Sequence, residues 1–495
     1  MSEEAPSLYQ KQSVLESEDW WAVWLGLFIF LLGLGPIYGK DLLGWVVTNN
    51  VWIELSKSIK PVSPGYSSLS GLSSMILTYI FMLVLTSIGV MAMGKNVKSY
   101  AVAFTIIFWI VMACMIAGNN AYIAATPDKQ AAFKIPWSLS LGEMGFVVAM
   151  IVGLVIGNFF PSLAKFLEDA AKPEWFIKTG IVILGAAIGI KAVGALGLAS
   201  TVIISGTCAT AQAYLIYWPV VYYVSRKYFK FTPEWAAPLA SGISVCGVSA
   251  AIATGAAIRA RPVVPVILSA VIIVFVAVEL LFLPWLAQAF LYREPMVAGA
   301  WMGLVVKSDG GAVASGAITD SLISAKALTE LGIRWEPGWM LMAATTTKVF
   351  IDVFIGIWAF VLAIVWSVYR IGQPDAASDT ARTKVSAGEI WDRFPKFVIG
   401  FTLTFLILLI MGLDNPAIVK AAEKGSGDAN ALRTILFALC FFTIGMVTNV
   451  RKLWAEGMGR IVAVYAVCLF GFILWVGLLI SWIFYHGVMP PVLPH

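Results

Sequence analysis

Two glycine- and serine-rich segments within apolar sequence hold the residues whose types could do chemistry. The first contains Ser241, Ser244, Cys246, Gly247 and Ser249. Glycine and serine loosen a helix, and a broken helix in lipid must turn its freed backbone groups toward protein or a water-filled cavity. The half-helix that resumes after the break presents N–H groups and a positive dipole end, which suit an anion. We therefore predict substrate binding here; close helix packing through small residues is the alternative.

The second segment places charged residues inside apolar sequence, because Lys307, Ser308, Asp309, Gly310 and Gly311 follow one another. A Gly-Gly pair breaks helices, and an ionisable side chain at membrane depth is costly and therefore a functional hypothesis by default. We predict a second broken helix, whose lysine, serine and glycines bind the anion and whose aspartate couples an ion. A surface loop between two shorter helices is the alternative.

Further ionisable residues lie in neighbouring apolar stretches. Lys348 and Asp352 are four residues apart and share one face of a helix. They either neutralise each other or, with the charged pair of the second segment, form a network in which one lysine is left to hold an anion. We add Lys348 to the predicted substrate-binding residues. Asp309, Asp352, Glu279 and Glu143 are the candidates for ion coupling, because a carboxylate removed from water takes up a proton more readily.

The elements that position these residues must lie in lipid. Hydrophobic residues make up 60% and charged residues 12% of the 495 residues, whereas a soluble domain carries about 25% charged residues. The mean hydropathy is +0.87. The formal net charge of +5 is small and lies in loops, which argues against nucleic-acid binding.

Cysteine and histidine give no sign of a metal site, a disulfide framework or a cofactor. The five cysteines are widely spaced without a CxxC pair. The two histidines, His486 and His495, lie at the C-terminal end. We therefore expect neither a metal nor a cofactor.

Apolar stretches of spanning length indicate an all-α polytopic membrane protein with about thirteen transmembrane helices. We divide it into an N-terminal extension with three spans (1–137) and a transporter core with about ten (138–495). The stretch 41–55 is predicted as a short interfacial helix. The predicted spans are 20–37, 68–93, 98–118, 138–160, 174–191, 199–225, 235–258, 262–290, 297–320, 338–369, 395–413, 433–449 and 457–485.

Clusters of lysine and arginine set the expected orientation. The basic clusters in 226–230, 371–396 and 451–452 fall on the side of the N-terminus, which we take as cytoplasmic. Arg259 and Arg261 fall on the opposite side in this topology, against the positive-inside rule. We expect a multi-pass protein of the plasma (inner) membrane with an extracytoplasmic C-terminus.

A repeat suggests two halves of opposite orientation. The windows 143–197 and 399–459 are alike at an offset near 256 residues, and Gly185-x-x-x-Gly189 resembles the segment around Gly445. The windows run in opposite directions in the predicted topology, which is typical of inverted-repeat transporters with discontinuous helices near the bilayer midplane. Generic glycine-rich packing is the alternative. The two polar segments also resemble each other, yet this topology runs them in the same direction.

The first polar segment resembles a signature of the YeiH-like sulfate exporter family. Ser244-Val-Cys246-Gly247-Val-Ser249-Ala-Ala, followed by a basic turn, is similar to that family's Ile-Cys-Gly-Ala-Ser-Ala run. The resemblance covers about 140–485. It implies an inverted-repeat transporter, related to cation–proton antiporters and bile-acid symporters, that exports a small oxyanion or a sulfonate. Three more segments follow the family's order: Gly153-x-x-x-Gly157-Asn158, Lys178-Thr-Gly180-Ile-Val-Ile-Leu-Gly185 and Trp301-Met-Gly303.

The chain departs from the family's pattern at the predicted site. Lys307 and Gly311 stand where the family typically has a histidine and a Gln-Val-Val-Ala-Ala-like run. Lys348 matches a lysine of the family, but Asp352 replaces the usual basic residue. Because both departures fall at the predicted site, the substrate and the coupling ion need not be those of typical members of the family.

The function that we expect is ion-coupled secondary transport, by alternating access, and not catalysis. The substrate would be a small inorganic or organic anion, such as sulfate or a sulfonate, exported with H⁺ or Na⁺ as the coupling ion. The alternative is a sodium-translocating membrane subunit of a decarboxylase-type pump, in which Asp309-Gly310 binds the ion. An intramembrane enzyme and an ATP-driven pump lack support, because the sequence contains no His-Glu-x-x-His motif and no nucleotide loop. The expected partners are the anion, the coupling ion and the lipid bilayer; a homodimer is left open.

Overall fold

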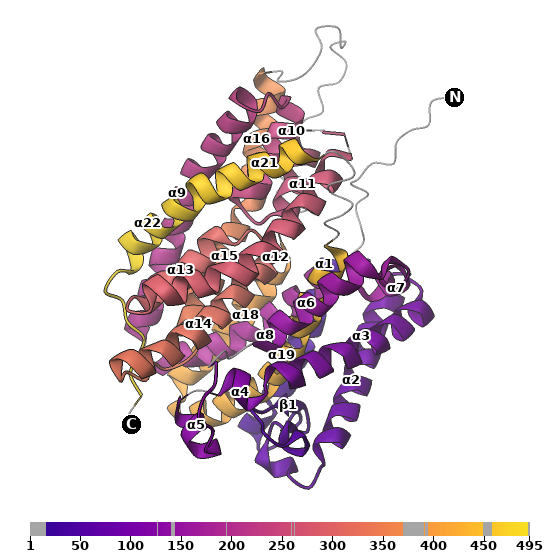
Figure 1. Cartoon of the computed structure of the whole chain (residues 1–495), viewed down its shortest axis with the longest axis vertical. Helices are drawn as coiled ribbons and strands as arrows, with labels where there is room; N and C mark the ends of the chain where they lie inside the picture. The colour runs from indigo at the N-terminus through magenta and orange to yellow at the C-terminus, as the bar shows by residue number, and fades with distance from the viewer. Residues whose placement is uncertain are drawn as a thin grey trace.

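The chain is an all-α polytopic membrane protein (Figure 1). Within the described residues, nine helical segments are long and apolar enough to cross a membrane. Each predicted span lies on one helix or on two or three consecutive helices. The computed structural model describes residues 16–125, 127–139, 144–194, 196–258, 260–261, 263–369, 391, 395–448 and 458–493.

The N-terminal part of the chain contains helices and one small strand pair. Its elements are α1 (Glu18–Gly33), η1 (Gly35–Tyr38), β1 (Val47–Asn49), η2 (Leu55–Lys57), β2 (Ile59–Pro61), η3 (Pro64–Tyr66), α2 (Gly71–Ala92), α3 (Val97–Gly118), α4 (Ala121–Ala124), α5 (Pro127–Phe133), α6 (Met144–Phe159), α7 (Pro161–Phe166), η4 (Glu168–Ala170) and α8 (Pro173–Gly194).

The described remainder of the chain is built from helices. They are α9 (Leu196–Lys227), α10 (Pro233–Ser244), α11 (Val248–Ala257), α12 (Val263–Leu291), α13 (Pro295–Val305), α14 (Asp309–Leu331), α15 (Trp339–Val353), α16 (Ile355–Tyr369), α18 (Phe397–Asp414), η6 (Pro416–Ile418), α19 (Val419–Val447), α21 (Gly459–Cys468), η7 (Leu469–Ile473) and α22 (Leu474–Tyr485).

The segment 41–55 contains a strand and not the predicted interfacial helix. β1 and β2 pair antiparallel, with Val47 opposite Pro61. The Val47 N–H donates to the Thr78 hydroxyl of α2 at 3.0 Å. Consecutive β-branched residues favour the extended backbone here, and α2 supplies the partner that fixes it.

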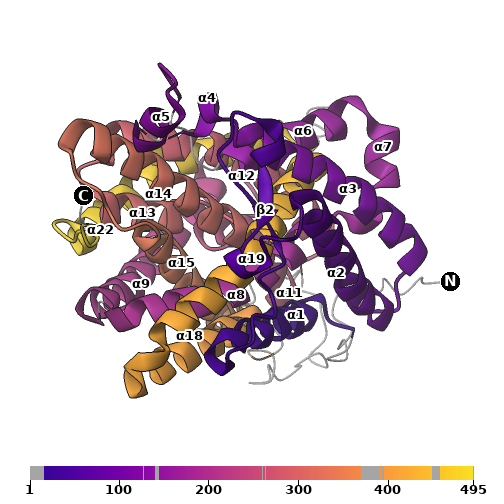
Figure 2. The same cartoon turned by 90° about the horizontal axis from the view of Figure 1, so that it is seen from below.

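The helices form two bundles (Figures 1 and 2). The scaffold bundle consists of α1, α2, α3, α6, α8, α18 and α19, in which α8 packs along α18 and α6 packs along α19. The hairpin bundle consists of α9 to α16 together with α21 and α22. The bundles meet where α14 contacts α8 and α19.

Glycines at equivalent positions bring the scaffold helices together. A Cβ atom on Gly189 of α8 would lie 2.3 Å from the Phe405 carbonyl oxygen of α18, and one on Gly445 of α19 would lie 2.2 Å from the Met150 carbonyl oxygen of α6. Such close backbone approach requires a residue without a side chain. Gly189 and Gly445 are separated by the offset of the predicted repeat, so the α8–α18 contact recurs as the α19–α6 contact. This geometry is the one that an inverted repeat predicts.

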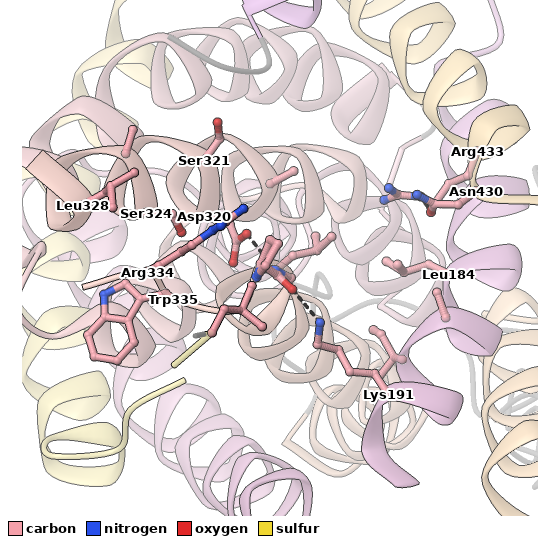
Figure 3. Close-up of a pocket in the computed structure, with 18 of the residues that line it drawn as sticks. Leu184, Lys191, Asp320, Ser321, Ser324, Leu328, Arg334, Trp335, Asn430 and Arg433 are labelled. Carbon is pink, nitrogen blue, oxygen red and sulfur yellow. Dashed lines mark hydrogen bonds between the residues drawn. The ribbon is translucent and has the colours of Figure 1, made fainter. Parts of the chain in front are cut away.

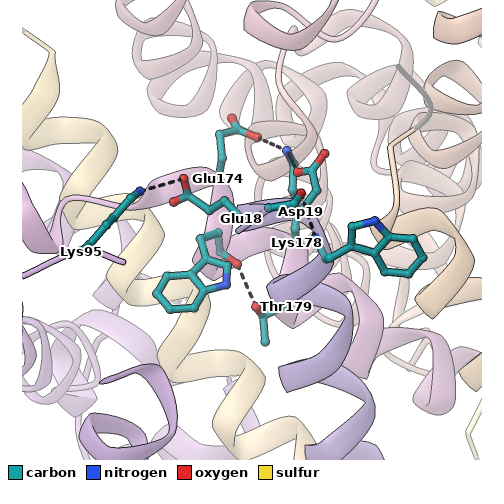
Figure 4. Close-up of polar contacts among 9 residues, drawn as sticks. Glu18, Asp19, Lys95, Glu174, Lys178 and Thr179 are labelled. Carbon is teal, nitrogen blue, oxygen red and sulfur yellow. Dashed lines mark hydrogen bonds and ion pairs between the residues drawn. The ribbon is translucent and has the colours of Figure 1, made fainter. Parts of the chain in front are cut away.

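Charged residues join the predicted N-terminal extension to α8 within the scaffold bundle (Figure 4). Lys178 of α8 is 8% exposed, and its Nζ lies 2.8 Å from Asp19 of α1 and 3.6 Å from Glu174. Glu18 of α1 lies 3.7 Å from Lys95. α1 also packs along α18. The N-terminal helices thus extend the scaffold bundle, and the division of the chain at residue 137 stays a prediction.

The first polar segment folds back on itself. α10 and α11 are joined by Val245–Gly247. The Thr254 hydroxyl of α11 donates to Ser241 Oγ of α10 at 2.7 Å, although these residues would lie about 20 Å apart in one continuous helix. At the open end, Arg261 Nε donates to Glu234 Oε1 at 2.9 Å. α10 and α11 are therefore the two arms of a re-entrant hairpin.

The second polar segment forms another hairpin. Gly303 of α13 and Gly316 of α14 both face Ala344 of α15, so the two arms lie at the same level. Further along α14, Asp320 accepts the Met340 N–H at the start of α15 at 3.0 Å. α14 therefore returns toward the end from which α13 came.

Two of the thirteen predicted spans, 235–258 and 297–320, are thus hairpins and do not cross; the prediction was wrong there. The physical reason is length. α10, α11 and α13 contain 12, 10 and 11 residues, or about 15–18 Å each, half of a hydrocarbon core of about 30 Å. α14 is longer, with 23 residues, but its first half returns beside α13. Because α12 runs between the hairpins, they enter from opposite ends of the molecule. The two similar polar segments therefore run in opposite directions, as an inverted repeat requires. The predicted topology ran them in the same direction.

The first hairpin also moves Arg261 to the other side of the membrane from the one predicted. α11 returns to the end where α10 began, so Arg261 lies beside Glu234, close to the basic cluster 226–230 that ends α9. The predicted violation of the positive-inside rule at Arg261 was a consequence of the wrong topology. Arg259 lies outside the described residues.

Candidate functional site

The tips of the two hairpins touch inside the hairpin bundle. Gly247, in the first tip, has a φ of +76°. A Cβ atom there would lie 2.0 Å from the Lys307 carbonyl oxygen in the second tip. Glycine is the residue that tolerates both the left-handed backbone and so close a contact. The sequence thus places glycine where the two backbones cross.

Lys348 of α15 binds both tips. Its side chain is 1% exposed, and Nζ donates to the carbonyl oxygens of Val245 at 2.9 Å and of Val306 at 3.2 Å. Both carbonyls lie in the breaks, outside the flanking helices. A buried carbonyl left without a partner costs about 1–3 kcal/mol. One ammonium group therefore pairs the open backbone of both hairpins and joins their tips.

Lys307 lies in the second tip and is fully buried. Its Nζ donates to the Leu304 carbonyl at 2.5 Å and lies 4.9 Å from the centroid of the Tyr217 ring. Its backbone N–H donates to Glu279 Oε2 of α12 at 2.9 Å. The other carboxylate oxygen, Oε1, has no hydrogen-bond partner in the described part of the chain. Because an ammonium group has three donors, Lys307 retains capacity to bind an anion.

The serines of the first hairpin have different surroundings. Ser241 Oγ accepts hydrogen bonds from Trp218 Nε1 at 2.9 Å and from the Thr254 hydroxyl at 2.7 Å, so it holds the two arms together. Ser244, the last residue of α10, is buried, and its Oγ has no partner among the residues described. Cys246 is buried in the tip. Ser244 is the hydroxyl of this hairpin best placed to meet a ligand.

The start of α14 lies at the boundary between the bundles. Ser308 caps this helix, because its Oγ accepts the Gly311 N–H at 2.8 Å. A Cβ atom on Gly310 would lie 2.9 Å from Ile177 of α8 and 3.3 Å from Cys440 of α19. The second tip therefore contacts both the first tip and the scaffold bundle.

Four predicted site residues lie where the structure describes no side chain. Glu143 lies outside the described residues. Asp309 begins α14, Asp352 lies in α15 and Ser249 lies in α11, but their side chains are outside the part of the structure that is described.

Two tyrosines that gave no signal in the sequence complete the buried polar cluster. Tyr217 lies beside Lys307. Tyr465 of α21 stacks on Phe275, one turn from Glu279 in α12, with 4.1 Å between ring centroids. Both tyrosine hydroxyls are buried without a partner among the described residues. Such hydroxyls usually find a partner when buried, but the tyrosines lie far from the polar segments in sequence, which hid the association.

The arrangement joins buried positive charge to polar atoms that can still bind. Among the side chains that the structure describes, the tips gather two lysines and one carboxylate. In a low-dielectric interior, this excess of positive charge favours an anion strongly over a neutral molecule. Within the described residues, no group of His, Cys, Asp and Glu suited to a metal is found.

Comparisons with known proteins give relatives that are membrane proteins. The profile described as conserved hypothetical protein 698 matches residues 134–464. A UPF0324 membrane protein of Nitrosomonas europaea is 41% identical over 481 residues, which cover 96% of this chain and 97% of that protein. A UPF0324 membrane protein of Rhodopirellula baltica is 30% identical over 76% of this chain and 61% of its own length. No solved structure matches the chain.

Proposed function

We propose that this chain, which belongs to the conserved hypothetical protein 698 family of UPF0324 membrane proteins, is a secondary active transporter of a small anion. The observation that carries the proposal is the meeting of two re-entrant hairpins from opposite ends of the molecule, with the buried ammonium groups of Lys307 and Lys348 at their tips. Irregular backbone at membrane depth is tolerated where it is buried in protein or lines a path for a solute.

The roles of the two lysines differ in this proposal. Lys348 holds the tips together through the Val245 and Val306 carbonyls. Lys307 supplies the counter-charge for the anion, assisted by Ser244 and by the N–H groups that begin α11 and α14. Alternating access then follows from movement of the hairpin bundle against the scaffold bundle, as in other inverted-repeat transporters.

Protons fit the site better than sodium as the coupling ion. In inverted-repeat transporters, carbonyls of unwound helices coordinate Na⁺. Here the ammonium of Lys348 occupies that place between the tip carbonyls. Glu279, with one carboxylate oxygen unpartnered among the described residues, is the group we assign to proton coupling. The same occupation of the tip carbonyls counts against a sodium-translocating pump subunit.

The orientation that we propose for the protein in the membrane follows from the distribution of basic residues, and the proposed direction of transport follows from the resemblance to the YeiH-like family. With Arg261 beside the basic cluster 226–230, the end of the molecule that carries the N-terminal start of α1 is the basic one and is assigned to the cytoplasm. The membrane would be the plasma (inner) membrane. The resemblance to the YeiH-like family supports export of sulfate or a sulfonate.

Uptake by proteoliposomes tests the proposal. The wild-type protein should move radiolabelled sulfate or a labelled sulfonate when a pH gradient is imposed. Lys307→Ala should abolish this flux while the temperature of thermal unfolding changes by no more than a few degrees. Lys57→Ala, which removes a lysine whose side chain is 73% exposed, is the matched control. Unchanged uptake by Lys307→Ala would show that Lys307 does not bind the substrate.

A further inference from the structure

A pocket of about 570 Å³ lies at the boundary between the bundles (Figure 3). Most of its wall comes from α8 and α19 of the scaffold bundle and from α14 and the α14–α15 connection of the hairpin bundle, and Lys129 of α5, Leu341 of α15 and Leu493 complete it. It opens at the end of the molecule from which the second hairpin enters. Pockets for small organic ligands have volumes of about 300–1,000 Å³.

The pocket leads toward the hairpin tips. Its wall contains Leu184 of α8, Ala317 of α14 and Arg433 of α19. Along the same three helices, Ile177, Gly310 and Cys440 meet at the second tip. In each helix, the residue that lines the pocket lies seven residues, or about 10 Å, from the residue that contacts the second tip. Three helices from both bundles thus connect the pocket with the proposed anion site.

Positive charge dominates the pocket wall. The lining contains four basic residues, Lys129, Lys191, Arg334 and Arg433, and one acidic residue, Asp320. The carboxylate of Asp320 is already engaged, because it accepts backbone N–H groups from the start of α15 and its preceding residue, at 3.0 and 2.7 Å. It therefore fixes the start of α15, and its single negative charge leaves the four basic residues in excess.

The basic side chains approach from different walls. In Figure 3, Arg433 reaches into the pocket with Asn430 from α19, while Arg334 lies on the α14–α15 connection across from it. Arg433 contacts Asn430 and lies 4.8 Å from the Phe437 ring centroid. Lys191 is 2.7 Å from Glu336 and donates to the Pro337 carbonyl, so its charge is largely balanced. The two arginines are the residues best suited to grip a planar or tetrahedral acid group.

Apart from Asn430 and two serines, Ser321 and Ser324, the uncharged side chains of the wall are apolar. Leu184, Ile188 and Leu341 line it together with the ring of Trp335. An inorganic oxyanion such as sulfate would fill a small part of this volume and would gain nothing from these side chains. An organic anion with one acid group and an apolar body would use both parts of the wall.

We propose that this pocket is a vestibule that binds an organic anion, a carboxylate or a sulfonate with an apolar body, on its path to or from the hairpin tips. The proposal rests on the proposed function and narrows its substrate class. Arg433 and Arg334 hold the acid group, and the apolar wall holds the body.

Calorimetric titration of the purified full-length protein tests the binding step. We expect benzenesulfonate to bind, sulfate to bind at least tenfold more weakly, and benzyl alcohol not to bind measurably. Arg433→Gln and Arg334→Gln should each weaken benzenesulfonate about tenfold, the loss expected for one charge-assisted contact. Arg293→Gln, which removes an arginine outside the pocket wall, is the matched control. Arg334→Gln decides the outcome if Arg433→Gln fails to fold.

Equal affinity of the wild type for sulfate and benzenesulfonate would overturn the proposed ligand class. Unchanged affinity of both arginine variants for benzenesulfonate would overturn the proposed site. Ser321→Trp, which fills the pocket, should block flux of benzenesulfonate in proteoliposomes. If Ser321→Trp leaves that flux intact, the proposal of a vestibule is refuted, whereas the proposed transport function is not. If the wild type carries no anion at all but binds benzenesulfonate, the proposed function fails while the binding site stands.

Discussion

Three of the lysines that are buried among the described residues, Lys178, Lys307 and Lys348, fall into two kinds by their partners. Lys178, where α1 packs on α8, lies 2.8 Å from Asp19 and 3.6 Å from Glu174. Lys348 and Lys307, at the hairpin tips, donate to backbone carbonyls at 2.5–3.2 Å. The same residue type is thus neutralised by carboxylates in one region and held by dipoles in the other.

The difference bears directly on function. A lysine between two carboxylates offers no net charge to a ligand, and its role is to fix the position of a helix. A protonated lysine whose ammonium group is held by carbonyls has no carboxylate bound to it, so in a low-dielectric interior its attraction for an anion is strong. Burial of a lysine in a membrane protein is therefore not by itself a sign of a binding site; the chemistry of its partners decides.

The largest effect in this comparison should come from Lys348→Met. It leaves the tip carbonyls of Val245 and Val306 without a donor, at a cost of about 1–3 kcal/mol each. Thermal unfolding in detergent should shift down by several degrees, and flux in proteoliposomes should fall below detection. A variant that keeps wild-type flux would show that the tips do not depend on this ammonium group.

Gly247→Ala should have the next largest effect, because the new Cβ atom would lie 2.0 Å from the Lys307 carbonyl oxygen at a residue with positive φ. We expect at least a tenfold loss of flux, with destabilisation of more than about 1 kcal/mol. Gly197→Ala is the control, since nothing lies within 4 Å of the added atom. The contact between the tips is refuted if the two variants behave alike.

Glu279→Gln should abolish the coupling of transport to protons while it leaves binding of the anion intact. The amide keeps an acceptor for the Lys307 N–H but no longer exchanges a proton. Anion exchange at equal pH should stay within a few-fold of wild type, whereas accumulation driven by a pH gradient should be lost. Measurement of flux with and without the gradient checks this, and retention of gradient-driven accumulation would exclude Glu279 as the coupling group.

Asp19→Asn should have the smallest effect. Lys178 retains Glu174, and Asp19 is partly exposed, so the loss of stability should be about 1 kcal/mol or less. Flux should be unchanged. A large loss of flux with intact stability would contradict the structural role assigned to this lysine and would bring the N-terminal helices into the transport mechanism.

The sequence located the breaks in the helices better than it located the fold-back of the chain. Glycine and serine runs marked both breaks, and charges in apolar sequence singled out Lys307, Lys348 and Glu279, whose assigned roles remain predictions. The fold-back of the hairpins was missed, because two half-helices of 10 to 12 residues have the same combined length as one span. The signal that could have revealed it was Arg261, whose predicted position violated the positive-inside rule.

The vestibule was missed for another reason. Asp320 and Arg433 stood at the ends of predicted spans, where charged residues are ordinary. Their proximity depends on the packing of α14 against α19, and a sequence without known contacts does not contain that information. The partners of Lys178 depend in the same way on the docking of α1 on α8, so the two kinds of buried lysine look alike in sequence.

Flux of radiolabelled sulfate and of labelled benzenesulfonate through Lys307→Met and Lys178→Met in proteoliposomes tests the central claim most directly. Both variants lose one buried ammonium group, so general damage to the fold would affect them alike. If the charge at the hairpin tips holds the anion during transport, Lys307→Met should lose at least tenfold in flux of the anion that the wild type carries, and Lys178→Met should carry it as the wild type does. Equal flux through the two variants would contradict the assignment of the anion site to the hairpin tips.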